Sequence, residues 1–399
     1  MYASKRSSVD MGKQCAILTS FDPYSFKGGI ETYTCRLVEL LQSRGITVDI
    51  YHTGSALCTR EKQTPPFSFH SPFLNDLYPV GRSFYRVDHQ YDFVIAHAFF
   101  GFGYCPPRIP AFNIFHSTHV QYAEDNRTLF SPEWYLEVKH LFGFGAERLS
   151  TIGRRVIAVS DGVASEVVEH YQATAVSTIL TGVDRALFFP HPERRGLREK
   201  FNIPQDAFVG VFLARWGLDK GIDVLQSVMD GAPDVFWVLV LGTGTPCPLH
   251  GRPNVKIIEN VAQETVAEIL SLADFLLHTS RYEGFGLAVI EAMACGLPAM
   301  ATPVGVARSV YQERPFSLLR LPPYTSGTAE VIAAAIEKIE RLRWDTQLHR
   351  AVSEKGQLVV HKQFDHRRWE TDMLAAFGIH EEHVPIHERA ENQKDYHNP

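Results

Sequence analysis

The chain has 399 residues, a formal net charge of −6 and 45% hydrophobic residues. This length suits two domains of ordinary size, and the lack of a basic excess disfavours a nucleic-acid-binding protein. No apolar run reaches the ~18 residues of a membrane span, and residues 1–13 lack the apolar segment of a secretory signal. The six cysteines form no C-x-x-C pair, so we expect reduced thiols and a cytoplasmic protein.

A strand, a helix and a second strand open the patterned part of the chain. The apolar run at 14–20 predicts a buried strand, and residues 30–44 have helical spacing with Tyr33 and Leu37 on one face. A further strand is expected at 47–52. Because two parallel strands need a crossover between them, this order predicts a parallel sheet.

The pattern then weakens and returns before the middle of the chain. Residues 54–81 are rich in Pro, Ser and Thr, and we interpret them as an irregular excursion. Residues 120–150 are expected to be mostly helical. Four more strands are expected at 93–97, 111–115, 156–159 and 177–180.

The alternation of strands and helices restarts after a linker predicted at 189–205. Two alternating blocks predict two doubly wound α/β domains, over residues 1–185 and 186–365. We further predict a C-terminal helix over 366–379 that packs back on the first domain, and a disordered tail over 380–399. In the second domain, strands are expected at 208–214, 236–241, 255–258, 275–279 and 298–301, and helices at 220–230, 264–273 and 287–294.

The densest group of chemically informative residues follows the strand at 275–279. Its glycines allow a tight turn, and a helix start near Leu287 offers free N–H groups to a diphosphate. In this setting the Glu283 carboxylate can accept hydrogen bonds from sugar hydroxyls, and Glu291 can bind a ribose diol. Taken singly, Glu283 is better explained as a helix cap and Glu291 as a solvated charge, so only the whole string favours a ligand site. The group comprises Glu283, Gly284, Phe285, Gly286, Leu287 and Glu291.

Two cations and two glycines add to this site. Arg215 follows the strand at 208–214, at the carboxyl edge where open α/β sheets bind ligands, and Lys220 lies in the next loop. Together they can neutralise a diphosphate, although out of context each would be a solvated charge. Gly28 and Gly29 follow the first strand and let backbone N–H groups approach a ligand. No G-x-G-x-x-G follows that strand, which disfavours a dinucleotide cofactor.

Taken together and in chain order, these motifs resemble those of glycosyltransferase family 4, whose members have the GT-B fold. The E-x7-E motif of that family is matched by Glu283 and Glu291, and residues 292–298 match its continuation. Weaker matches, taken in chain order, are Gly28 with Gly29, Phe115 with His116, Val159 with Ser160, Gly182 to Asp184, and Arg215 with Lys220 and Gly221.

The resemblance implies two Rossmann-like domains that face each other across a cleft. It implies transfer of a hexose-type sugar, with retention of configuration, from a nucleotide-diphosphate sugar to a glycan, lipid-linked or small-molecule acceptor, as in polysaccharide biosynthesis. It implies catalytic roles for Glu283, His116, Arg215 and Lys220, with His116 near the sugar, and it implies neither metal nor cofactor. The donor base, the sugar and the acceptor stay open. The lone His97 and His119 are expected to be structural.

The chain departs from the family pattern in three places. Thr181 replaces an Asn before Gly-Val-Asp, and Trp216 replaces a small residue or Leu. Residues 305–308 replace a Gly-Gly followed by an acidic residue, which puts the loop around the donor in question.

Two other functions are compatible with parts of the pattern. One is an epimerase-like enzyme acting on sugar nucleotides, and the other is a non-catalytic nucleotide-sugar binder. The missing nicotinamide fingerprint argues against the first, and the intact set of cations and glutamates argues against the second. The aromatic run at 99–104 is expected to pack in the core; the alternatives are an acceptor wall or contact with a membrane surface, at its inner face.

Overall fold

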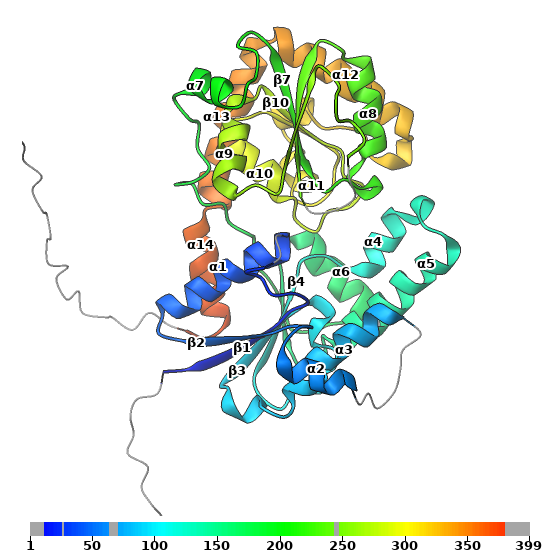
Figure 1. The fold of residues 1–399 in the computed structure, drawn as a ribbon, viewed down its shortest axis with the longest axis vertical. Coiled ribbons are helices and arrows are strands. Elements are labelled where there is room, and N and C mark those ends of the chain that lie inside the picture. Colours follow the sequence, from blue (N-terminus) through cyan, green and yellow to red (C-terminus); the bar gives the residue numbers. More distant parts are fainter. Residues whose placement is uncertain (1–11, 26–27, 64–70, 243–246, 380–399) are drawn as a thin grey trace, which may run out of the picture.

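The computed structural model describes residues 12–25, 28–63, 71–242 and 247–379, so the predicted tail at 380–399 lies outside the described residues. Two lobes, each built on a parallel sheet, face each other (Figure 1). The first sheet has the strand order β2-β1-β3-β4-β5-β6. Its strands are β1 (Gln14–Leu18), β2 (Thr47–Tyr51), β3 (Phe93–His97), β4 (Ala111–Phe115), β5 (Arg155–Ala158) and β6 (Val176–Thr178).

The central strands of this sheet are mainly apolar, as expected for a parallel sheet whose two faces are both covered. Every residue of β3 and β4 is buried. Helix α1 (Gly29–Ser43) packs on the sheet through Tyr33, Leu37 and Leu41, on the face that helical spacing predicts. The other elements between β3 and β6 are η2 (Ala98–Gly101), α4 (His119–Asp125), η3 (Arg127–Leu129), α5 (Pro132–Leu136), the π-helix η4 (Glu137–Glu147) and α6 (Asp161–Tyr171).

The prediction of an irregular excursion at 54–81 is wrong for the residues of this range that the structure describes, 54–63 and 71–81. Helices α2 (Ala56–Gln63) and α3 (Pro72–Phe84) occupy this part, followed by η1 (Asp88–Gln90). Pro72 stands in the first turn of α3, where its missing N–H costs nothing, and Leu77 and Phe84 are buried. Ser71 and Pro72 therefore mark the beginning of a helix.

The second sheet has the strand order β11-β10-β7-β8-β9. All of its pairings are parallel, so the restart of alternation after the first domain is confirmed. Its strands are β7 (Phe208–Ala214), β8 (Val235–Leu241), β9 (Val255–Glu259), β10 (Phe275–His278) and β11 (Ala299–Ala301). Its main helices are α8 (Ile222–Gly231), α9 (Gln263–Leu272), α10 (Leu287–Ala294), α11 (Ala307–Val310), α12 (Thr328–Trp344) and α13 (Thr346–Gln363), with short turns η5 (Leu218–Lys220), η6 (Phe316–Leu318) and η7 (Tyr324–Ser326).

The region predicted as a linker at 189–205 contains helix α7 (Arg194–Lys200). This helix belongs to the second domain, because the guanidinium groups of Arg194 and Arg198 bind carbonyl oxygens at the end of α9 and the Asp274 carboxylate. The stretch is therefore an ordered part of the second domain.

The chain crosses between the lobes twice, and the two crossings lie side by side. The Val183 N–H donates to the Phe364 carbonyl, and the His366 N–H donates to the Val183 carbonyl. Gly182 allows this approach, since a Cβ there would lie 2.6 Å from the His366 Cα. After the second crossing, α14 (His366–Ala376) lies against α1 in the first lobe (Figure 1).

The aromatic run at 99–104 is part of the core of the first domain. Phe99, Phe100, Phe102 and Tyr104 are all buried, so this run offers no membrane-facing surface. Within the described ranges, no helix has both the length and the apolar character that crossing a lipid bilayer requires.

Candidate active site

A cavity of about 420 Å³ lies between the carboxyl ends of the strands of the two sheets. Of the residues predicted for the site, all but Gly28 and Glu291 line it. Those that line it are Gly29, His116, Arg215, Lys220, Glu283, Gly284, Phe285, Gly286 and Leu287. Open α/β sheets present their ligand sites at this edge, which is why residues far apart in the chain meet here.

The segment from Glu283 to Gly286 lies directly against the first domain, where Gly284 contacts His116 and Ser160. A Cβ on Gly284 would overlap the His116 carbonyl oxygen, so a glycine is required there. Gly286 has φ +90° and stands at the start of α10, a conformation that L side chains rarely adopt. The first N–H groups of a helix have no partner within it, and Gly286 and Leu287 at the start of α10 both line the cavity.

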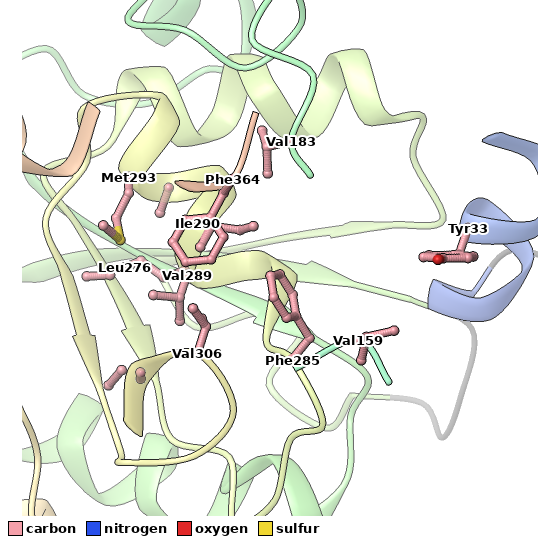
Figure 2. Close-up of a cluster of buried hydrophobic side chains, with 14 of the residues drawn as sticks. Tyr33, Val159, Val183, Leu276, Phe285, Val289, Ile290, Met293, Val306 and Phe364 are labelled. Atoms are coloured by element: carbon pink, nitrogen blue, oxygen red, sulfur yellow. The ribbon is translucent and has the colours of Figure 1, made fainter. Parts of the chain in front are cut away.

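The Phe285 side chain anchors this segment in the core. It is buried, and its ring lies 5.9 Å from that of Phe364. Figure 2 shows Phe285 beside Val159 of the first domain, while Ile290 and Met293 of α10 point into the cluster behind it. The glutamate and the two glycines are therefore held between an apolar support and the cavity.

The Glu283 carboxylate is bound by three groups of the second domain. Its Oε1 accepts hydrogen bonds of 2.7 Å from Lys220 Nζ and of 2.7 Å from Ser280 Oγ, and His278 Nε2 lies 3.5 Å away. Burial alone would raise the pKa of Glu283, but Lys220 and His278 outweigh it and hold the pKa well below its ordinary value. Glu283 is therefore an anion at neutral pH and is not a proton donor.

The second cation of the cavity is also paired. Arg215 Nη2 donates to Asp219 Oδ2 at 2.7 Å, and the Arg215 side chain is 54% exposed while that of Asp219 is 11% exposed. Each of the two cations thus has one carboxylate partner, and the exposed guanidinium can turn its remaining N–H groups to a ligand. Asp219 gave no signal in the sequence beyond its position between the two cations.

His116 stands at the end of β4, where it forms part of the cavity wall. Burial lowers its pKa to about 4, so the imidazole is neutral at physiological pH. The Tyr33 ring packs edge-on against it at 4.7 Å between centroids. Tyr33 itself accepts a hydrogen bond from Trp369 of α14 and lines the same cavity.

Glu291 lies away from the cavity wall. It is buried in α10, so the simpler interpretation of this glutamate as a solvated charge is wrong. Burial raises its pKa to about 7, and the charge of Arg36 on α1 offsets part of the rise. The Arg36 guanidinium reaches across to Gln263 Oε1 at 2.7 Å, so this edge of the interface brings the first domain close to Glu291.

Direct hydrogen bonds join the two domains beside the cavity. The Tyr282 hydroxyl donates to Glu166 Oε2 at 2.8 Å and accepts from the Thr118 N–H at 2.8 Å. The Ser160 hydroxyl donates to the Gly284 carbonyl at 2.6 Å. Sequence reasoning missed this contact set, apart from Ser160, because its members come from opposite domains.

The three departures from the family pattern fall around the cavity without removing its main groups. Thr181 lines the cavity, and Trp216 is buried. In the loop at 305–308, Gly305 keeps φ +52°, and the Val306 N–H donates to the Phe285 carbonyl at 2.6 Å. The loop therefore supports the segment that carries Glu283.

Both halves of the chain match known sequence families. Residues 27–187 match the family described as glycosyltransferase family 4, and residues 193–359 match the family described as glycosyl transferases group 1. N-acetyl-alpha-D-glucosaminyl L-malate synthase of Bacillus anthracis is 28% identical over 236 residues, which are 57% of this chain and 59% of that protein. The chain thus spans little more than half the length of this relative.

Solved structures of similar fold cover almost the whole chain. Sucrose-phosphate synthase from Thermosynechococcus elongatus has a TM-score of 0.69 at 21% identity, over 92% of this chain and 98% of that one. Anabaena HepE in complex with UDP-glucose has a TM-score of 0.64 at 19% identity, over 92% and 99%. At such identities the likeness establishes the two-domain fold, and the two sequence matches establish the ancestry. The chain therefore belongs to glycosyltransferase family 4 and has the GT-B fold.

Proposed function

We propose that this chain is a retaining hexosyltransferase that moves a sugar from a nucleotide-diphosphate sugar to an acceptor hydroxyl. One observation carries the proposal: Arg215, Lys220 and the start of α10 share a single interdomain cavity with Glu283 and His116. Cations and free N–H groups suit a diphosphate, while a carboxylate and a neutral imidazole suit sugar hydroxyls.

The leaving diphosphate is the group that most needs stabilisation in such a transfer. In the proposed complex it meets the exposed guanidinium of Arg215, the Lys220 ammonium and the N–H groups at Gly286 and Leu287. Negative charge grows on the leaving phosphate in the transition state, and preorganised donors there lower the barrier more than they tighten ground-state binding. Removing one such donor typically costs about 10²–10³ in kcat.

The sugar would lie against Glu283 and His116. Since Glu283 is anionic and His116 neutral at pH 7, both accept hydrogen bonds from sugar hydroxyls, and neither supplies a proton. In the retaining reaction that we propose, the acceptor enters from the first domain and attacks on the face that the diphosphate leaves. The leaving phosphate then takes the acceptor proton while the sugar is oxocarbenium-like.

The proposed site can exclude water, which would otherwise hydrolyse the donor. The Tyr282–Glu166 and Ser160–Gly284 hydrogen bonds close the interface next to the cavity. Opening and closing of the lobes would then gate donor entry and product release, as in other two-domain enzymes.

Two of the predicted donor-binding residues, Gly28 and Glu291, could contact the donor only if the domain interface rearranged. Gly28 is the N-cap residue that precedes α1, and Glu291 lies inside α10; neither lines the cavity. We propose that Glu291 binds the ribose diol when Arg36 is displaced from its edge of the interface, and that the N–H of Gly28 approaches the donor with the neighbouring Gly29.

The first test of this proposal identifies the donor. Thermal unfolding measured with UDP-, GDP- and ADP-sugars should show one nucleotide that raises the melting temperature, and the loss of that shift in Lys220→Ala ties the shift to this cavity. Turnover is then sought with sugar, lipid-linked and small-molecule hydroxyls. L-malate is included because the Bacillus anthracis relative is named for a glucosaminyl malate product. Specific binding without transfer to any acceptor would favour a non-catalytic binder, and no shift across the panel would contradict the donor site.

A further inference from the structure

A chain of buried polar groups runs from α1 to His116 behind the cavity wall. Thr34 Oγ1 donates to the Ile30 carbonyl at 2.7 Å and lies 3.1 Å from His97 Nε2. On the other side of the same ring, His97 Nδ1 lies 2.9 Å from His116 Nε2. Thr34 and His97 are completely buried, so no solvent competes for these bonds.

The positions of the protons in this chain follow from the hydrogen-bond capacities of its members. A hydroxyl has one hydrogen, and Thr34 gives it to the Ile30 carbonyl, so His97 Nε2 must donate to the Thr34 oxygen. Burial lowers the pKa of His97 well below its ordinary value, and the nearby His116 lowers it further. A neutral imidazole has only one N–H, so His97 Nδ1 carries a lone pair and accepts from His116 Nε2.

The tautomer of His116 is thereby determined. Its Nε2 holds the proton and its Nδ1 holds a lone pair. Among the residues that the structure describes, His97 is the one hydrogen-bond partner of the His116 ring, so Nδ1 is left for a ligand in the cavity that His116 lines. A lone pair attracts an O–H or N–H group and repels a phosphate oxygen.

We propose that His97 and Thr34 are positioning residues, which fix His116 in the tautomer whose Nδ1 accepts a hydrogen bond from a hydroxyl of the bound sugar. This inference rests on the proposed function, and it replaces the expectation that His97 is only a structural core residue. His97 touches no ligand and acts through His116. As a consequence, His116 distinguishes one sugar from another by the position of a hydroxyl group, and it does not contribute to recognition of the diphosphate.

The tautomer itself can be measured without any substrate. In the full-length protein labelled with ¹⁵N-histidine, two-bond ¹H–¹⁵N correlations separate Nε2–H from Nδ1–H imidazoles, and the loss of signals in His116→Asn assigns the ring. We expect His116 to be neutral at pH 7 with its proton on Nε2. A proton on Nδ1, or an imidazolium, would overturn the proposal, whereas failure of the proposed function would leave this result unchanged.

Two matched pairs of variants then test the positioning role in turnover. His97→Leu removes the acceptor of the His116 proton, whereas His97→Asn keeps an oxygen that can accept it. Similarly, Thr34→Val removes the hydroxyl and Thr34→Ser keeps it. At metal sites, hydrogen-bond partners that orient a ligating side chain contribute about 10- to 100-fold, and we take this as the scale here. We expect a loss of that size in kcat for His97→Leu and a smaller loss for Thr34→Val, with substantial rescue in Asn and Ser.

The Kd of the free nucleoside diphosphate separates a positioning role from a merely structural one. A structural defect would weaken diphosphate binding together with turnover, whereas a positioning defect would lower turnover alone. We expect this Kd to stay within twofold in all four variants, because the diphosphate meets Arg215 and Lys220 and not His116. Equal kcat in His97→Leu and His97→Asn, or a parallel loss of diphosphate binding, would contradict the positioning role. If His97→Leu does not fold, the Thr34 pair and the tautomer measurement still decide the question.

Discussion

Lys220 Nζ and Glu283 Oε1 lie 2.7 Å apart, although 63 residues separate them in the chain. The ammonium and the carboxylate are both mostly buried, with 16% and 20% of their side chains exposed. The Lys220 ammonium therefore helps to hold Glu283 in its charged form at the cavity wall. A ligand that approaches this pair meets a fixed cation beside a fixed anion, which fits a molecule with a diphosphate next to a polyhydroxyl ring.

Removing either member of this pair should abolish most transfer while leaving the fold intact. We expect Lys220→Ala and Glu283→Ala each to lower kcat/KM by about 10²–10³, since each removes a preorganised charge and leaves its partner uncompensated. Steady-state kinetics with the donor identified by thermal unfolding checks this. The exposed Lys355→Ala on α13 serves as the control and should keep full activity. Full activity in both cavity variants would remove Lys220 and Glu283 from the site.

Arg215 should act mainly on the diphosphate. Hydrogen bonds to charged groups contribute about 1.5–3 kcal/mol, so Arg215→Ala should raise the Kd of the nucleoside diphosphate roughly 10- to 100-fold. Part of the loss comes from Asp219, whose carboxylate would then face the ligand unpaired. Arg215→Lys should lose less, because it keeps the charge without the planar fork. Isothermal calorimetry measures this, with the exposed Arg195→Ala as control; unchanged affinity in Arg215→Ala would contradict the assignment.

Gly284 provides a steric test of domain closure. Its Cβ would overlap the His116 carbonyl oxygen, so Gly284→Ala should force the lobes apart, lower the melting temperature and reduce transfer. Gly196 on α7 is a matched control, because a Cβ there meets nothing within 4 Å. Gly196→Ala should be neutral or stabilising by about 0.5–1 kcal/mol. Small-angle scattering and activity distinguish the two variants, and a Gly284→Ala enzyme of unchanged shape and rate would be inconsistent with the closed interface.

Glu291 should make stability depend on pH. Its pKa rises from 4.5 to about 7 in the folded protein because of burial, so the folded state prefers the protonated form. The stabilisation from this preference is present below pH 4.5 and is lost as the pH rises to about 7; it amounts to about 3 kcal/mol. Glu291→Gln keeps the neutral shape, so its free energy of unfolding should exceed that of the wild type by more at pH 8 than at pH 5.

Urea unfolding at both pH values measures this difference for Glu291→Gln and for the exposed control Glu264→Gln. The control should show the same offset from the wild type at pH 5 and pH 8. A constant offset for Glu291→Gln as well would mean that the carboxyl group titrates normally in the folded protein.

Chelation should leave the reaction intact. We propose that Arg215, Lys220 and the N–H groups of α10 supply the positive charge that a divalent cation supplies in other sugar-transfer enzymes. Turnover in excess EDTA should therefore equal turnover in Mg²⁺ or Mn²⁺. A rate that collapses on chelation and returns with one of these ions would show that the side chains are insufficient.

Local sequence was enough to predict the second-domain part of the cavity. The apolar strand β10, the glycines at 284 and 286 and the helix after them are consecutive, so strand, turn and helix follow from neighbouring residues. The cations at 215 and 220 follow β7 in the same way. Each is at the carboxyl end of a parallel strand, and the topology alone then brings them to one edge.

The contacts between distant segments could not be predicted in this way. His97 and His116 are 19 residues apart, and they meet because β3 and β4 are neighbours in register, which the composition of either strand does not specify. Tyr282 and Glu166 are 116 residues apart and meet only because the two lobes pack together. Helix α3 was missed for a local reason, since Pro72 and Pro79 were interpreted as loop residues when one begins the helix and the other lies within it.

The stereochemistry of transfer tests the central claim most directly. With the donor found by thermal unfolding and an acceptor that turns over, ¹H NMR follows the anomeric proton of the transferred sugar from donor to first-formed product. The account predicts that an α-linked donor gives an α-linked product at a rate that Lys220→Ala abolishes. A β-linked product, or an unchanged rate in Lys220→Ala, would contradict it.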